Sequence, residues 1–279
     1  MYREGQLDIT ASIPSGDALY ALADEFGDEL YVTPYGGTYY YAFNSTMAPY
    51  DDPMIRSALS MAIDRDRITT DVSPGNVVAY SFVPPSISGG YEVQYPSWAS
   101  MTQAERTAMA KEVMASKGYT ADNPMEVVIN YNTSEGHKQI ALAISDMWAE
   151  IGVAVELFNQ DVSTHYAGLQ AQEFEIGRAG WIWDYPDAEN LLALVGPNSP
   201  YNYGLYDNAE FNALLAASYG QTGDERIATM EAAEAIAMEE AALAPIYHYN
   251  SKHLVASYVE GWLPNGDDRH PSRWISLAD

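Results

Sequence analysis

Hydrophobic and polar positions alternate with two different periods along the chain, and segments of the two kinds follow one another. Runs with a period of two predict strands, and runs with an apolar residue at every third or fourth position predict helices. The predicted strands are 7–13, 29–34, 38–44, 125–131, 153–158, 174–181 and 245–249. The predicted helices are 17–26, 53–67, 102–117, 137–151, 162–170, 209–219 and 225–242.

Several of these helices have clear end signals. Pro53 occupies the first position of the helix predicted over 53–67, where a missing N–H costs nothing. Thr102 and Glu105 have the spacing of a capping box, and Gly118 is a natural stop for the helix that they begin.

The order strand, helix, strand, helix, strand between residues 125 and 181 indicates the fold class. Strands joined through helices pair in parallel and are covered by those helices. We therefore expect an α/β fold with a mixed, largely parallel sheet flanked by helices. The chain shows no internal repeat, low-complexity tract or long flexible linker.

Composition and charge exclude several classes of function. The 39 acidic residues outnumber the 13 basic ones and give a formal net charge of −26, which disfavours a nucleic-acid partner. A solvated acidic surface accounts for this charge better than an acidic ligand-binding face does. There is no cysteine, so disulfides, thiolate metal sites and cysteine nucleophiles are ruled out. No apolar run reaches the roughly 20 residues of a membrane span. The residues that follow Met1 lack the basic and then apolar run that is typical of a signal peptide.

Motifs for catalysis, cofactors and metals are missing from the sequence. It contains no G-x-S-x-G, H-E-x-x-H, phosphate-binding loop or G-x-G-x-x-G, so we expect no enzyme and no cofactor. The histidines lack tight metal-ligand spacing. His248 and His253 are five positions apart in a strand-and-turn region, and we expect no metal site there.

One segment combines charge, glycine and aromatic rings at the carboxyl end of the strand predicted over 174–181. Open α/β sheets bind their ligands at such strand ends. Gly180 would let a ligand backbone approach, Trp181 and Trp183 offer apolar walls, and Arg178 and Asp184 offer a cation and an anion. In the alternative interpretation the two charges pair with neighbours and the tryptophans fill the core.

Tyrosine is the other unusual feature, with 22 residues in the chain. A rigid ring with a hydroxyl grips side chains of varied shape in a wet pocket. The candidate pocket residues are Asn202, Tyr247 and Tyr249, which lie in the clusters 201–203 and 247–249. A further cluster occupies 39–41. Ordinary half-buried strand positions explain most of the tyrosines equally well.

Seven blocks of sequence resemble the peptide-binding proteins of ABC importers, especially the periplasmic oligopeptide-binding type. They lie in order and cover nearly the whole chain. The blocks are 5–8, 38–44, 48–65, 79–85, 131–138, 178–185 and 245–249.

The resemblance implies a two-lobed, monomeric periplasmic protein that closes on a short peptide and delivers it to an ABC permease. Residues 38–254 would form a second ligand-binding lobe of the periplasmic-binding-protein kind. Residues 1–37 and 255–279 would be a remnant of the first lobe with its crossover strands. Members of the family are longer, so the amino-terminal lobe would be the partner that this chain lacks.

The resemblance also assigns roles within the site. Asp184 matches the acid that receives the peptide's α-ammonium group, and Arg178 and His137 match cationic positions that receive its carboxylate. Met47 stands where a relative has lysine, so we expect the preferred peptide length or sequence to differ from that of the relative. Two alternatives remain: the same scaffold binding another solute, such as a dipeptide, a murein peptide or a metal complex, and a truncated interaction module that binds nothing small.

Overall fold

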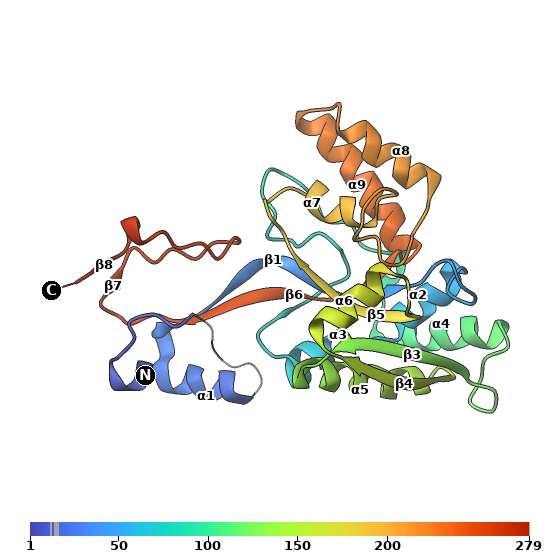
Figure 1. Ribbon diagram of the computed structural model, residues 1–279, viewed down its shortest axis with the longest axis horizontal. Helices are drawn as coiled ribbons and strands as arrows, with labels where there is room; N and C mark the ends of the chain where they lie inside the picture. The colour runs from blue at the N-terminus through green and yellow to red at the C-terminus, as the bar shows by residue number, and fades with distance from the viewer. Residues whose placement is uncertain (12, 14–16, 279) are drawn as a thin grey trace.

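A mixed six-stranded sheet forms the centre of the computed structural model, which describes residues 1–11, 13 and 17–278 (Figure 1). The strand order is β2-β6-β1-β5-β3-β4. β3 runs parallel to β4 and β5, whereas β1 runs antiparallel to β5 and β6. The strands are β1 Leu30–Phe43, β2 Val77–Val78, β3 Met125–Asn132, β4 Val153–Gln160, β5 Ile176–Ile182 and β6 Leu243–Leu254.

Helices cover both faces of this sheet, as the expected α/β class requires. In Figure 1, α4 and α5 lie beside β3 and β4, and α7, α8 and α9 stand together on the other side. No helix in the part of the chain that the structure describes is both long and apolar enough to cross a membrane. The helices are α1 Asp17–Phe26, α2 Pro53–Met61, α3 Arg65–Arg67, α4 Gln103–Ser116, α5 Glu135–Ala149, α6 Val162–Gln170, α7 Glu189–Leu192, α8 Ala209–Ser218 and α9 Gly223–Glu239.

Strand alternation along β1 divides the core into two clusters. Tyr39, Tyr41 and Phe43 pack with residues of α2, α4 and α5. Tyr40 and Ala42 point the opposite way and pack with residues of α7, α8 and α9. The expected α/β architecture with a mixed, helix-flanked sheet is therefore confirmed. The sheet is not largely parallel as predicted, because β1 pairs antiparallel with β5 and β6, β2 pairs antiparallel with β6, and only β3 pairs in parallel, with β4 and β5.

The two strands predicted over 29–34 and 38–44 are in fact one strand, β1. β1 continues through Gly36 and Gly37, with a register irregularity against β6. A Cβ atom on Gly36 would overlap the indole of Trp183. The glycine therefore serves close packing and not chain reversal.

The single helix predicted over 53–67 is also wrong. α2 ends at Met61, and Asp64 begins a new helical segment by accepting the backbone N–H of Arg67 at 3.0 Å. Aspartate favours such capping over a helix interior. The period of the apolar residues crosses the break because Ile63 and Ile68 still pack into the same cluster as α2.

The strand predicted over 7–13 is absent from the described residues of that segment. Ile9 makes a single antiparallel bridge with Val255, and Thr10 donates its N–H to the Leu254 carbonyl at 3.0 Å. Residue 12 lies outside the described residues. The segment joins the edge of β6 without forming an element of its own.

Both ends of the chain lie away from the helices that flank the sheet. Figure 1 shows α1, β7 (Val259–Glu260) and β8 (Ser276–Leu277) at one end of the molecule, with β1 and β6 running from them into the rest. This arrangement agrees with crossover strands between two parts. The boundaries at residues 37 and 255 remain a prediction.

Candidate functional site

Arg178 lies in β5 with a side chain that is only 7% exposed. Its Nη1 donates to Asn132 Oδ1 at 3.0 Å and to the Tyr166 hydroxyl at 3.1 Å, and its Nη2 donates to the Tyr249 hydroxyl at 3.3 Å. The guanidinium carbon sits 4.6 Å from the centre of the Tyr39 ring. We call these five residues the Arg178 cluster.

The charge of Arg178 has no carboxylate partner among the described residues, none of which forms an ion pair with it. Its Nε also has no hydrogen-bond acceptor. Buried charges in proteins are normally paired, because desolvating an ion is costly. The guanidinium is therefore poised to bind an anion.

His137 lies beside this cluster on α5. Its Nδ1 is 3.4 Å from the Tyr39 hydroxyl, and the two rings are 5.5 Å apart. Burial and then the positive charge of Arg178 lower the pKa of His137 from 6.5 to about 3. The ring is thus neutral at neutral pH, whereas the family resemblance implied a cationic position.

Asp184 lies two residues beyond the end of β5, and its side chain is exposed. Its carboxylate takes part in no ion pair within the described ranges. Its backbone N–H donates to Asn190 Oδ1 at 3.2 Å, and Trp181 Nε1 donates to the same oxygen at 3.0 Å. Asn190 therefore fixes the turn that presents a free carboxylate to solvent.

The two tryptophans lie apart from Arg178. Side chains alternate along β5, so Trp181 points away from the Arg178 face and packs against the cluster that contains Tyr40. Trp183 is 6% exposed and donates its Nε1 to Asp267 Oδ1 at 2.7 Å. For Trp183 these contacts agree with the alternative interpretation, in which the tryptophans fill the core.

Gly180 and the tyrosines of β6 form one wall of the cluster. A Cβ atom on Gly180 would lie 3.3 Å from Arg178 Nη2 and closer still to the Tyr249 hydroxyl. Tyr247 is 5% exposed and stacks on Tyr39 with ring centres 4.7 Å apart. Burial raises the pKa of Tyr249, which keeps its hydroxyl protonated.

Asn202 uses its amide within its own loop. Its Nδ2 donates to the carbonyls of Val195, Gly196 and Tyr206, and its Oδ1 accepts the Tyr206 N–H at 3.0 Å. Both amide hydrogens are therefore engaged, and the side chain stabilises the loop that carries Tyr203.

Three members of the Arg178 cluster were missed by sequence reasoning: Tyr39, Asn132 and Tyr166. Asn132 is the last residue of β3, which is parallel to β5. The rule that ligands gather at the carboxyl ends of parallel strands would have found it. Tyr39 and Tyr166 carry no comparable signal, because their contacts depend on strand pairing and on the position of α6.

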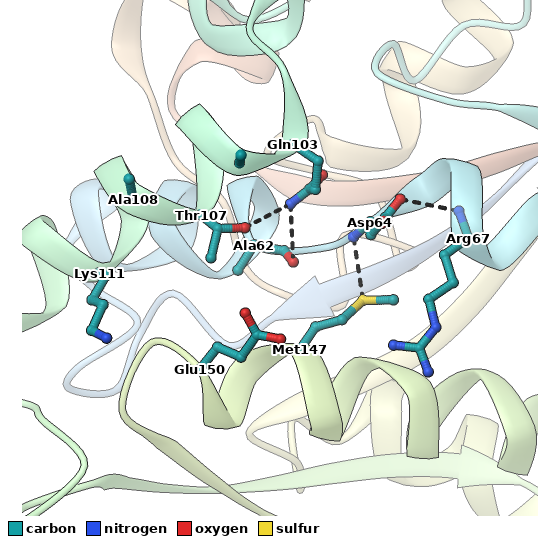
Figure 2. Close-up of a pocket in the computed structure, with 10 residues that line it drawn as sticks. Ala62, Asp64, Arg67, Gln103, Thr107, Ala108, Lys111, Met147 and Glu150 are labelled. Carbon is teal, nitrogen blue, oxygen red and sulfur yellow. Dashed lines mark hydrogen bonds between the residues drawn. The ribbon is translucent and has the colours of Figure 1, made fainter.

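A surface hollow of about 620 Å³ lies elsewhere, between α4, α5 and the turn before α3 (Figure 2). Arg67 and Lys111 line it together with Asp64 and Glu150. Hydrogen bonds join its walls: Gln103 Nε2 donates to the Ala62 carbonyl at 3.4 Å, and the Asp64 N–H donates to Met147 Sδ at 3.2 Å. None of the predicted site residues lines this hollow, and we assign it no role.

Comparison with known proteins identifies the family. Residues 1–203 match the sequence pattern described as bacterial extracellular solute-binding proteins, family 5 Middle. The chain is 35% identical to the periplasmic oligopeptide-binding protein OppA of Escherichia coli K12 over 264 residues, covering 94% of this chain and 48% of OppA. It is 36% identical to the periplasmic murein peptide-binding protein MppA of the same strain over 281 residues, covering 99% of this chain and 52% of MppA.

A solved structure shows the same relationship. Haemophilus influenzae OppA in complex with the peptide RPPGFSPFR superposes with a TM-score of 0.88 at 32% identity, over 100% of this chain and 55% of that chain. The chain thus spans about half the length of the relatives that it matches. These matches show that it belongs to the bacterial extracellular solute-binding proteins of family 5, which bind solutes and are not enzymes.

Proposed function

We propose that this chain is about half of a periplasmic protein that binds short peptides between two lobes and delivers them to an ABC permease. The relatives OppA, an oligopeptide-binding protein, and MppA, a murein peptide-binding protein, support this proposal at 35% and 36% identity. In this proposal residues 38–254 form one lobe, and residues 1–37 and 255–279 belong to the crossover and the opposite lobe. The rest of that lobe corresponds to the length of the relatives that this chain does not cover.

The unpaired guanidinium of Arg178 is the observation that carries the proposal. A peptide carboxylate would supply the missing negative charge and an acceptor for Nε. His137 stands beside it as a neutral partner, and a bound carboxylate would favour its protonated form. Tyr39, Tyr166 and Tyr249 would surround the same group with hydroxyls and rings.

Asp184 would receive the α-ammonium group at the other end of the peptide. Its exposed carboxylate has no competing cation in the described part of the chain. Six positions separate residues 178 and 184, and an extended chain spans at most about 20 Å over that number of residues. The Cα atoms of the two residues therefore lie no more than about 20 Å apart, a distance that a short extended peptide can bridge.

A murein peptide is a second candidate, favoured by the 36% identity to MppA. Such a ligand also has a carboxylate that Arg178 would bind. The Arg178 cluster does not distinguish it from an ordinary oligopeptide, because both present the same terminal group. Specificity would therefore depend on side-chain pockets farther along the cleft.

Calorimetry and NMR titration with matched peptides test the proposal. We would compare a tetrapeptide with free ends, its N-acetyl form, its C-terminal amide and a murein tripeptide. We expect the free-ended peptides to bind, and each blocked end to weaken binding. Equal binding of free and doubly blocked peptides would contradict the assigned roles.

The isolated chain should bind these peptides weakly. A peptide held from one side stays partly solvated, and exposed ion pairs contribute only about 0 to 1 kcal/mol each. Submicromolar affinity for the 279-residue chain by itself would argue against a grip shared between two lobes.

A further inference from the structure

A second group of polar side chains gathers where β6 meets the carboxyl-terminal segment. His253 Nε2 lies 2.9 Å and 3.1 Å from the two carboxylate oxygens of Asp268. His270 Nε2 lies 3.2 Å from the first of these oxygens. One ligand atom from each of the three residues lies within 4.8 Å of the others. None of the three belongs to the Arg178 cluster.

The hydrogen bonds of His253 determine which of its ring nitrogens presents a lone pair to Asp268. Its Nδ1 is 2.8 Å from the carbonyl oxygen of Thr10. A carbonyl only accepts, so Nδ1 carries the hydrogen, and in the neutral ring Nε2 is an acceptor. The carboxylate of Asp268 is also an acceptor. Two acceptors at 2.9 Å require a proton or a metal cation between them.

Anchoring of one ring nitrogen to a backbone carbonyl is the arrangement that metal-binding histidines adopt. It fixes the tautomer and the direction of the other nitrogen. His253 is 7% exposed, so its ring is held in place by packing as well. The hydrogen bond to Thr10 thus aims Nε2 at the position that a metal ion would occupy.

The other two side chains are also held in place. Trp262 stacks on His270 with ring centres 3.5 Å apart and planes at 15°, and it packs edge-on against His253. Asn265 accepts the backbone N–H of Arg269 at 3.1 Å and shapes the turn that carries Asp268. The three groups therefore converge before any ion binds.

We propose that His253, Asp268 and His270 bind a divalent transition-metal ion of the zinc type. Zinc bonds of about 2.0–2.2 Å to nitrogen and oxygen place tetrahedral ligand atoms about 3.3 Å apart. The separations of 2.9, 3.1 and 3.2 Å between the histidine nitrogens and the Asp268 oxygens need to widen by only a few tenths of an ångström. The two histidine nitrogens lie within 4.8 Å of each other and need to approach to about 3.3 Å at most. Three protein ligands leave a fourth position open to water or another donor.

The sequence analysis considered a different pair, His248 and His253, and predicted no metal site for it. The structure separates them, because His248 lies against Thr38 and Ser81, at 2.9 and 3.3 Å. His253 and His270 are 17 positions apart, and the carboxyl-terminal segment folds back on β6 to bring them together. A metal ion there would tie that segment to the crossover strands.

Calorimetric titration of Zn²⁺ into the metal-free 279-residue chain tests the site. We expect one saturable zinc site, and we expect Asp268→Asn and His270→Gln each to weaken it at least tenfold. Asp122→Asn is the matched control, because it makes the same charge change at an exposed position remote from the cluster. Circular dichroism and the metal-free melting temperature would establish that each variant is folded.

Two further measurements separate this site from weak cation binding by an acidic surface. Excess Mg²⁺ should leave zinc binding intact, because magnesium prefers oxygen ligands. Zn²⁺ should raise the melting temperature of the chain, and this rise should disappear in Asp268→Asn. Absence of saturable zinc binding, or unchanged zinc affinity in folded Asp268→Asn and His270→Gln, would overturn the proposal.

Discussion

The hydroxyl of Tyr249 lies 2.5 Å from the point that a Cβ atom on Gly180 would occupy. The same hydroxyl accepts a hydrogen bond from Arg178 Nη2 at 3.3 Å. Gly180 therefore leaves the space that lets Tyr249 hold the guanidinium. Glycine at this position serves the geometry of the cluster as well as any approach of a ligand backbone.

Gly180→Ala should displace Tyr249 and weaken peptide binding by about tenfold, with a stability cost of about 1–3 kcal/mol from overpacking. Peptide titration and urea unfolding measure the two effects. Gly168→Ala is the matched control, since the nearest atom to its new Cβ would be 4.0 Å away, in the side chain of Gln160. Unchanged peptide affinity in Gly180→Ala would mean that Tyr249 takes no part in peptide binding.

Arg178→Met should separate binding from stability. The substitution removes a buried charge without a carboxylate partner and keeps an apolar stem, so we expect the free energy of unfolding to change by no more than about 1 kcal/mol. Peptides with a free carboxylate should lose about tenfold or more in affinity, because the charge-assisted bonds are lost.

C-terminally amidated peptides provide the control for Arg178→Met. They carry no terminal carboxylate, so the substitution should change their affinity little. A large loss of stability, together with equal losses of affinity for amidated peptides and for peptides with a free carboxylate, would mean that Arg178 is a structural residue that organises Asn132 and Tyr166.

Asp184→Asn tests the opposite end of the proposed peptide. The side chain is exposed, so stability should stay within about 0.5 kcal/mol of the parent chain. Peptides with a free α-amine should bind more weakly, whereas N-acetylated ones should be unaffected. NMR titration suits the weak affinities expected here. Equal losses of affinity for both kinds of peptide would mean that Asp184 does not bind the α-ammonium group.

Local signals in the sequence predicted most of the fold. The capping box at Thr102 and Glu105 is present as expected, with Glu105 also accepting the Thr102 N–H at 2.8 Å. The parallel pairing of β3 with β4 and β5 follows from the order of elements. The division of β1 into two predicted strands was an error because tertiary packing decides the course of the chain at Gly36, whose missing side chain makes room for Trp183.

The candidate site was less accessible to sequence reasoning. Arg178 and Asp184 stood out because both belong to one short segment at a strand end. Asn132 and Tyr166 join Arg178 only through the pairing of β3 with β5 and the placement of α6. His253 and His270 also come together only through tertiary folding, so no short motif in the sequence predicts that they converge.

The pH dependence of stability should reveal the burial of His137. Its pKa is 6.5 in the unfolded chain and about 3 in the folded one, with burial as the main cause and Arg178 as the second. Between these values the unfolded chain binds a proton that the folded chain does not. The contribution of His137 to the free energy of unfolding should therefore fall as the pH drops from about 6.5 toward 3, by about 1 kcal/mol between pH 7 and 5 after allowance for partial exposure.

Two variants assign this dependence to His137. His137→Gln should make the pH profile of unfolding shallower over the same window, because one titrating group is gone, while His165 and His248, whose pKa values burial also lowers, still titrate there. Arg178→Met should raise the pKa of His137, measured by NMR of the imidazole protons, since a neighbouring positive charge opposes protonation. An unchanged His137 pKa in Arg178→Met would mean that the two groups are not electrostatically coupled, and that a single ligand carboxylate does not serve both.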